Sequence, residues 1–257
     1  YSNILFIFLR GIMSEKILGI KVTTKSKNEI LQELEKDIKN NKRNILFNAN
    51  PLIICNFYRD KKMVNEINKE SLNIPDGFGT VLASKLKHGQ IKERIAGIEM
   101  FDELCKLSLK TKSKIFIYGA KEENLDLAIK NIEKKYKNIN ICGYINGYIH
   151  EEDALKTILK ATPDFLFVAL GSPKQENFII KNKQKFKDIK VIMPIGGTID
   201  VYSGKINRAP SFYQKTHTEW LYRMIKEPKR FKQIFTLIKF VNLVIFKNNC
   251  YNESGDQ

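Results

Sequence analysis

This chain of 257 residues lacks the motifs of metal-binding and redox proteins. It contains three His, which stand alone, and four Cys (Cys55, Cys105, Cys142 and Cys250), which form no CxxC pair. Their spacing matches neither a zinc site nor a disulfide framework. We therefore expect reduced thiols in the cytosol and no metal site.

Nucleotide-binding fingerprints and membrane-spanning runs are also missing. The chain has neither GxGxxG nor GxxxxGK[ST], which argues against the common dehydrogenase and P-loop classes. The apolar run Ile4–Leu9 is too short to cross a bilayer and has no signal-peptide cleavage pattern. A domain opening, KILGIKV, follows Met13, so we expect residues 1–12 to be an extension outside the fold.

Positive charge is what the chain has in excess. Its 44 Lys and Arg against 28 Asp and Glu give a formal net charge of +16. Such a charge favours an anionic partner, namely nucleic acid, an acidic membrane surface or a phosphorylated substrate. The alternative is a lysine-rich composition that only keeps the protein in solution. A nucleic-acid-binding module is a rival interpretation, but the chain has no recognised motif or stacking platform for it, so we expect no nucleic acid partner.

Apolar segments alternate with amphipathic ones along the chain. Strands are expected at residues 16–22, 44–47, 71–75, 114–118, 140–144, 164–170 and 190–195. Helices are expected at 27–39, from 51, and at 78–87, 98–110, 121–136, 151–160, 173–185, 216–226 and 228–247. Because several strands are apolar on both faces, the pattern predicts a mostly parallel sheet covered by helices on both sides. We expect an α/β, Rossmann-like core over residues 13–210 and a helical C-terminal appendage over 211–257.

Four of the expected strands end in Asp or Gly at a turn. Asp76, Gly119, Gly171 and Gly196 follow strands whose carboxyl ends share one edge of a parallel sheet, where such folds bind ligands. Asp76, in IPDG, has two interpretations. It is either a helix cap or turn residue, or a general base that takes a proton from a hydroxyl nucleophile.

Other turns near these strand ends suit a ligand. Ser172 and Gln175 have the spacing of a capping box, with Pro173 suited to the first helical position. Gln175 is alternatively turned toward a ligand at the helix N-terminus, where phosphates bind. The glycines of Gly196-Gly197-Thr198 let the backbone approach a ligand closely, and Gly119 has the same freedom. Arg94 is either a surface cation or an anion clamp.

The C-terminal region combines cations with aromatic and aliphatic residues. Arg208, Arg223, Lys229 and Arg230 stand near Trp220 and Tyr222. This cluster is either a solvated helix face or a surface that lies on an anionic bilayer or grips a diphosphate. The largely apolar run at 233–246 is shorter than the roughly 20 residues that a membrane span needs.

Seven segments carry a resemblance to a known family. They are NANP (48–51), IPDGFGT (74–80), RIAGIEMFDEL (94–104), IFIYGA (115–120), PDFLFVALGSPKQENFI (163–179), IGGTIDVYSGKINRAP (195–210) and EWLYRMIKEPKR (219–230). In this order and spacing, the sequence resembles the WecG/TagA/CpsF glycosyltransferases, the bacterial family 26 enzymes, over about residues 16–235.

The resemblance implies an enzyme that works on a lipid-linked acceptor. It implies inverting, metal-independent transfer of a sugar, typically N-acetylmannosamine from its UDP derivative, to an undecaprenyl-diphosphate-linked sugar, without a cofactor. Such chemistry builds teichoic acid or other surface polysaccharides at the cytoplasmic membrane face, where the appendage docks. The same fold using another UDP-hexose for capsule or exopolysaccharide is the alternative. The sequence leaves a homo-oligomer open.

The resemblance also implies roles for particular residues. Asp76 becomes the general base, and Asn48 stands where the family usually has Thr. The substrate-binding set is Asn48, Asn50, Arg94, Gln175, Gly119, Gly171, Gly196, Gly197 and Thr198. The set for the lipid diphosphate and the membrane is Arg208, Arg223, Lys229 and Arg230.

Overall fold

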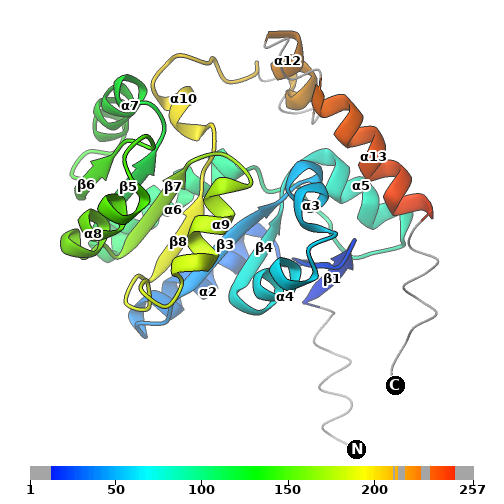
Figure 1. Cartoon of the computed structure of the whole chain (residues 1–257), viewed down its shortest axis with the longest axis horizontal. Coiled ribbons are helices and arrows are strands. Elements are labelled where there is room, and N and C mark those ends of the chain that lie inside the picture. The colour runs from blue at the N-terminus through cyan, green and yellow to red at the C-terminus, as the bar shows by residue number, and fades with distance from the viewer. Residues whose placement is uncertain (1–12, 211, 214–217, 227–231, 247–257) are drawn as a thin grey trace, which may run out of the picture.

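The computed structural model describes residues 13–210, 212–213, 218–226 and 232–246. The expected extension at residues 1–12 and the predicted lipid-diphosphate residues Lys229 and Arg230 lie outside this part of the chain. The described chain is an α/β structure whose two C-terminal helices run along one end of the sheet (Figure 1).

A six-stranded sheet of parallel strands forms the centre, in the order β4-β3-β8-β7-β5-β6. Its strands are β3 (Asn44–Ala49), β4 (Ser71–Pro75), β5 (Ile115–Gly119), β6 (Ile141–Ile145), β7 (Phe165–Ala169) and β8 (Val191–Pro194). β3 and β8 are neighbours although they lie far apart in the sequence, so the strand order changes direction beside them. This is the kind of position where open α/β sheets bind ligands.

Helices cover both faces of the sheet. Along β7, Leu166 and Val168 pack into one apolar cluster, and Phe165 and Phe167 pack into the other. The first cluster includes α3 (Pro51–Phe57), α4 (Lys61–Glu70), α5 (Phe78–Leu86), α8 (Glu151–Ala161) and α9 (Lys174–Asn182). The second includes α2 (Lys27–Lys39), α6 (Gly97–Thr111), α7 (Glu122–Lys135) and α10 (Thr198–Tyr202). Because side chains alternate along a strand, apolar strands bury both faces, and the predicted fold class is confirmed.

The N-terminal segment differs from the expectation of one strand over residues 16–22. It is an antiparallel hairpin of β1 (Ser14–Ile17) and β2 (Ile20–Thr23), in which Ile17 pairs with Ile20. The two residues between them, Leu18 and Gly19, both have positive φ, at 48° and 89°. A two-residue hairpin turn requires this conformation, and Gly19 provides it without strain.

The sequence reading also missed a helix, α4. Met63, Val64 and Ile67 are buried along one side of it. The Asp60 side chain caps it by accepting a hydrogen bond from the Met63 amide at 2.9 Å. The helix expected from residue 51 is α3, which ends at Phe57, and α4 follows it as a separate helix.

The C-terminal region contains α12 (Glu219–Lys226) and α13 (Lys232–Phe246). α13 packs against α3 and α5 (Figure 1) and buries Phe240 and Val244 in the first apolar cluster. Its other side leaves Phe235 and Phe246 about three-quarters exposed, at 75% and 74%. Within the described residues, no helix combines the length and apolarity that a membrane crossing needs.

Candidate functional site

A pocket of about 250 Å³ lies over the carboxyl ends of β4, β3 and β8. Eight of the predicted site residues line it: Asn48, Asn50, Asp76, Arg94, Gln175, Gly196, Gly197 and Thr198. Gly119 and Gly171 do not, although they follow strands of the same sheet. The structure therefore brings most of the predicted residues together and leaves Gly119 and Gly171, at the ends of β5 and β7, outside.

Asp76 lies at the corner between β4 and α5. The N-cap of α5 is Gly77, so Asp76 is not the cap that one interpretation made it. Gly77 has φ +80°, which glycine adopts without strain. The Asp76 amide donates to the Ala49 carbonyl at 3.2 Å, and the Thr80 hydroxyl donates to that same carbonyl at 2.8 Å. These bonds hold the corner against β3 and place a carboxylate at the pocket rim.

Each of the two asparagines at the end of β3 already makes one side-chain hydrogen bond within the protein. The Asn50 side chain caps α3 by accepting from the Ile53 amide at 3.0 Å. Asn48 donates its amide nitrogen to the Pro194 carbonyl at 3.1 Å, and its Oδ1 is buried without a hydrogen-bond partner in the described chain. Gly97 lies directly over Asn48, because a Cβ there would stand 2.9 Å from the amide nitrogen. Asn48, which lines the pocket, thus keeps one buried acceptor without a partner among the described residues.

Gln175 connects α9 to the glycine turn after β8. Its Oε1 accepts from the Gly196 amide at 3.1 Å, and its Nε2 donates to Glu176 at 2.9 Å. The expected capping box is absent, because the N-cap of α9 is Pro173 and no side chain caps it. The Ser172 hydroxyl instead accepts a hydrogen bond from Asn56 at 3.1 Å. The Gly196 amide is therefore held by Gln175.

Glu176, which the sequence reading did not single out, lies fully buried behind Gln175. Its Oε2 has no hydrogen-bond partner in the described part of the chain. Burial raises the pKa of Glu176, and the hydrogen bond from Gln175 only partly opposes this. The glycine turn after β8 is thus held, through Gln175, by a buried carboxyl group whose pKa is raised.

Close packing between the ends of β5 and β7 explains why position 119 is a glycine. A Cβ at Gly119 would stand 2.4 Å from the backbone of Ala169, and its φ of +127° suits glycine alone. Gly119 thus allows β5 and β7 to end side by side. Gly171 faces open space, since a Cβ there would meet no atom within 4 Å.

Arg94 forms a buried ion pair with a residue of the C-terminal region. Its Nη1 lies 2.7 Å from Oε2 of Glu219, the first residue of α12, and both side chains line the pocket. The two side chains are only 10% and 7% exposed. No local sequence pattern predicts this contact, because the two residues are 125 positions apart.

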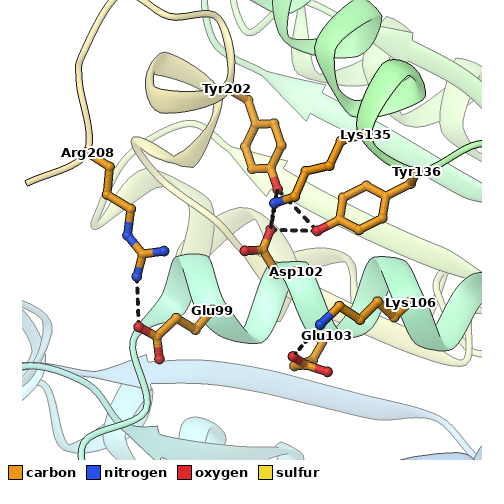
Figure 2. Close-up of polar contacts among 8 residues, drawn as sticks. All are labelled: Glu99, Asp102, Glu103, Lys106, Lys135, Tyr136, Tyr202 and Arg208. Atoms are coloured by element: carbon orange, nitrogen blue, oxygen red, sulfur yellow. Dashed lines mark hydrogen bonds and ion pairs between the residues drawn. The ribbon is translucent and has the colours of Figure 1, made fainter. Parts of the chain in front are cut away.

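A polar cluster around Asp102 of α6 holds α10, the helix that follows the glycine turn after β8 (Figure 2). Asp102 accepts hydrogen bonds from Tyr202, from Tyr136 at 2.8 Å and from Lys135 at 2.9 Å. Burial pushes the pKa of Asp102 up, but these three donors outweigh it and hold the pKa below its usual range. Burial and the bond to Asp102 raise the pKa of Tyr202. Asp102 therefore anchors α10 to α6 as a charged group.

The predicted cations of the C-terminal region are only partly described. Arg208 donates to Glu99 at 2.7 Å, on the same helix as Asp102 (Figure 2). Arg223 belongs to α12. In the described ranges, no group of three or more His, Cys, Asp or Glu is arranged to hold a metal ion.

A parallel sheet with a polar pocket over its strand ends defines an α/β enzyme of the Rossmann-like class. The model of the glycosyl transferase WecG/TagA/CpsF family matches residues 15–253, so the chain belongs to this family and is a glycosyltransferase. The resemblance drawn from the sequence motifs is thereby confirmed.

Two similar proteins carry the same name. The chain is 34% identical over 234 residues to the N-acetylglucosaminyldiphosphoundecaprenol N-acetyl-beta-D-mannosaminyltransferase of Bacillus subtilis (strain 168), covering 90% of this chain and 91% of the relative. It is 31% identical over 229 residues to the enzyme of the same name from Staphylococcus aureus (strain MW2), covering 88% and 89%.

Proposed function

We propose that this glycosyltransferase moves N-acetylmannosamine from UDP-N-acetylmannosamine to undecaprenyl-diphosphate-linked N-acetylglucosamine, with inversion and without a metal ion. The names of the two relatives, which align along nearly their whole length, support the sugar and the acceptor. This reaction belongs to teichoic acid or other surface polysaccharide synthesis. We place it on the cytoplasmic face of the cell membrane.

The observation that carries the proposal is the position of Asp76. It lines the pocket beside two asparagines, at the edge of the sheet where α/β enzymes bind ligands. A general base needs a carboxylate within hydrogen-bond reach of the hydroxyl that attacks. Asp76 deprotonates the acceptor hydroxyl, which then attacks the anomeric carbon from the side opposite the leaving UDP.

Arg94 neutralises the leaving diphosphate. It is the one cation among the described residues that line the pocket. A charge fixed in a site that excludes water stabilises an anion far better than it does in water. The unused Oδ1 of Asn48 accepts a hydrogen bond from the bound substrate at the pocket floor.

An apolar groove suits the lipid part of the acceptor. It runs between α5 and α13, where Leu82, Leu237 and Val241 line it. It shares Asn50, Gly77 and Phe78 with the polar pocket, so a molecule with a sugar diphosphate head and a prenyl tail reaches both.

The outer side of α13 provides a membrane-binding surface. Phe235, Ile238, Ile245 and Phe246 are exposed on it, and Lys239 lies over the Tyr58 ring at 5.3 Å. Exposed apolar residues beside cations are typical of helices that lie in the interface of an anionic membrane. The basic residues Arg223, Lys229 and Arg230 belong to the same C-terminal region.

The direct test is turnover with UDP-N-acetylmannosamine and a lipid-diphosphate N-acetylglucosamine analogue. We expect Asp76→Asn to lower kcat by about 10²- to 10⁴-fold, because it removes the base while it keeps the shape of the side chain. Binding of the UDP-sugar should stay close to that of the wild type. Asp153→Asn, in an exposed ion pair on α8, is the matched control. A near-wild-type rate for Asp76→Asn contradicts the assignment.

The donor is tested separately by comparing UDP-sugars. We expect UDP-N-acetylmannosamine to be turned over fastest. Faster turnover of UDP-glucose or another UDP-hexose would favour the alternative donor for capsule or exopolysaccharide.

Binding to DNA or RNA without any binding to anionic liposomes would favour the nucleic-acid module.

A further inference from the structure

The ion pair between Arg94 and Glu219 is incomplete. Arg94 Nε and Glu219 Oε1 are both buried and have no hydrogen-bond partner among the described residues. Buried charges are costly unless their remaining donors and acceptors are also satisfied. The pair therefore leaves two polar groups unsatisfied at the wall of the pocket.

A second guanidinium stands next to this pair. Arg208 Nε lies 3.8 Å from Glu219 Oε1, which is too long for a hydrogen bond, and this Nε also lacks a partner in the described chain. Glu99 holds the other end of Arg208 through a 2.7 Å bond to Nη2. Glu219 thus stands between two arginines and bonds only one of them.

We propose that Glu219 is a positioning residue that moves between these arginines. It holds Arg94 while the pocket is empty, and it transfers to Arg208 when a diphosphate binds Arg94. The inference rests on the proposed function, because it takes the ligand to be a nucleoside diphosphate.

The transfer improves the pairing of every group involved. A movement of about 1 Å brings Glu219 Oε1 within bonding distance of Arg208 Nε. Arg94 then gives its unpaired Nε and the released Nη1 to phosphate oxygens, and the carboxylate leaves the anion it would otherwise repel. Because Glu219 begins α12, binding of the donor also shifts α12 toward Arg208. Donor binding is thereby coupled to the C-terminal helices.

Calorimetry of UDP binding to the full chain tests the proposal, because two substitutions should change the Kd in opposite directions. We expect Glu219→Gln to lower the Kd about fivefold or more, because the glutamine keeps a hydrogen bond but no longer neutralises Arg94. We expect Arg208→Gln to raise the Kd about as much, because the carboxylate then has nowhere else to go. A merely structural ion-pair network predicts weaker binding for both variants.

The exposed pair Glu103–Lys106 on α6 supplies matched controls (Figure 2). Glu103→Gln and Lys106→Gln change the net charge by the same amounts as the two test variants, and we expect both to bind UDP as the wild type does. If Glu219→Gln does not fold, as judged by thermal unfolding, Glu219→Ala replaces it: tighter UDP binding is again the expected sign, and weaker binding would overturn the proposal.

Inorganic pyrophosphate, measured in parallel, separates this inference from the proposed function. The expected opposite signs with pyrophosphate, but no binding of UDP, would keep the role of Glu219 and refute the nucleotide donor. Equal UDP affinity in the wild type and both variants would overturn the role of Glu219 alone. Failure of all three proteins to bind either probe would overturn both.

Discussion

The pocket has two walls that hold their carboxylates in opposite ways. In the α10 wall (residues 195–202), Tyr202 is fixed to Asp102, which accepts from three donors. In the C-terminal wall (residues 218–226 and 232–246), Glu219 accepts one short bond from Arg94 and keeps a buried oxygen without a partner in the described chain.

This difference separates a fixed support from a movable one. Displacing a carboxylate whose hydrogen-bond partners are complete raises the free energy of the protein. Asp102 therefore keeps the glycine turn rigid. A carboxylate with an unsatisfied oxygen and a second cation nearby has two arrangements of similar free energy. One wall therefore keeps the shape of the pocket, and the other responds to what enters it.

The largest expected effect tests whether the C-terminal wall is part of the folded core at all. Phe240 is 1% exposed and packs near Gly79 of α5. We expect Phe240→Ala to lower the free energy of unfolding by about 3–5 kcal/mol through the lost burial and the cavity. Urea unfolding measures this.

The matched control changes the same residue type on the other side of α13. Phe235→Ala, at a position 75% exposed, should change stability by no more than about 0.5 kcal/mol but weaken pelleting with anionic liposomes. If Phe240→Ala costs no more than Phe235→Ala, α13 is not packed on the core. Unchanged pelleting would remove the membrane role of this surface.

The next prediction compares Asp102, whose hydrogen-bond partners are complete, with Glu219, which keeps an oxygen without a partner in the described chain. We expect Asp102→Asn to cost about 1.5–3 kcal/mol of unfolding free energy, because it removes the charge that three donors share. Glu219→Gln should cost less than Asp102→Asn, because one hydrogen bond depends on the Glu219 carboxylate and three depend on that of Asp102. Thermal and urea unfolding of both variants give the comparison. Equal costs would contradict the distinction between the two walls.

Most of the fold could be predicted because the strands are apolar on both faces and the helices are amphipathic. The two-residue turn at Leu18-Gly19 was missed because it sits inside an apolar run that alternates like one strand. α4 was missed because its polar stretch after Arg59 hides the spacing of Met63, Val64 and Ile67.

Site residues at local turns could be predicted from the sequence, whereas contacts between distant segments could not. Asp76, Asn50 and Gly196 stand at turns that the sequence marks with Asp, Asn-Pro and Gly-Gly. The contact of Glu219 with Arg94 joins residues 125 positions apart, which no local pattern encodes. The capping box was wrong because tertiary structure turns Gln175 toward Gly196.

The smallest effect comes from a third carboxyl group, that of the buried Glu176, which supports the α10 wall through Gln175. Burial raises its pKa in the folded protein, so the folded state favours the protonated form. Its contribution to stability is then fully present below the pKa of the unfolded chain, about 4.3, and is lost as the pH rises through the raised pKa. Glu176→Gln is neutral at every pH and does not lose it.

We therefore expect wild type and Glu176→Gln to be about equally stable near pH 4, and the variant to be more stable by about 1 kcal/mol at pH 8. Urea unfolding at pH 4, 6 and 8 measures the difference. Glu103→Gln, exposed on α6, should show no such trend. A gap that stays constant with pH, or that favours the wild type at pH 8, would mean that folding does not raise the pKa of Glu176. The α10 wall would then rest on an unsatisfied carboxylate as well, and the two walls would differ less than their hydrogen bonds indicate.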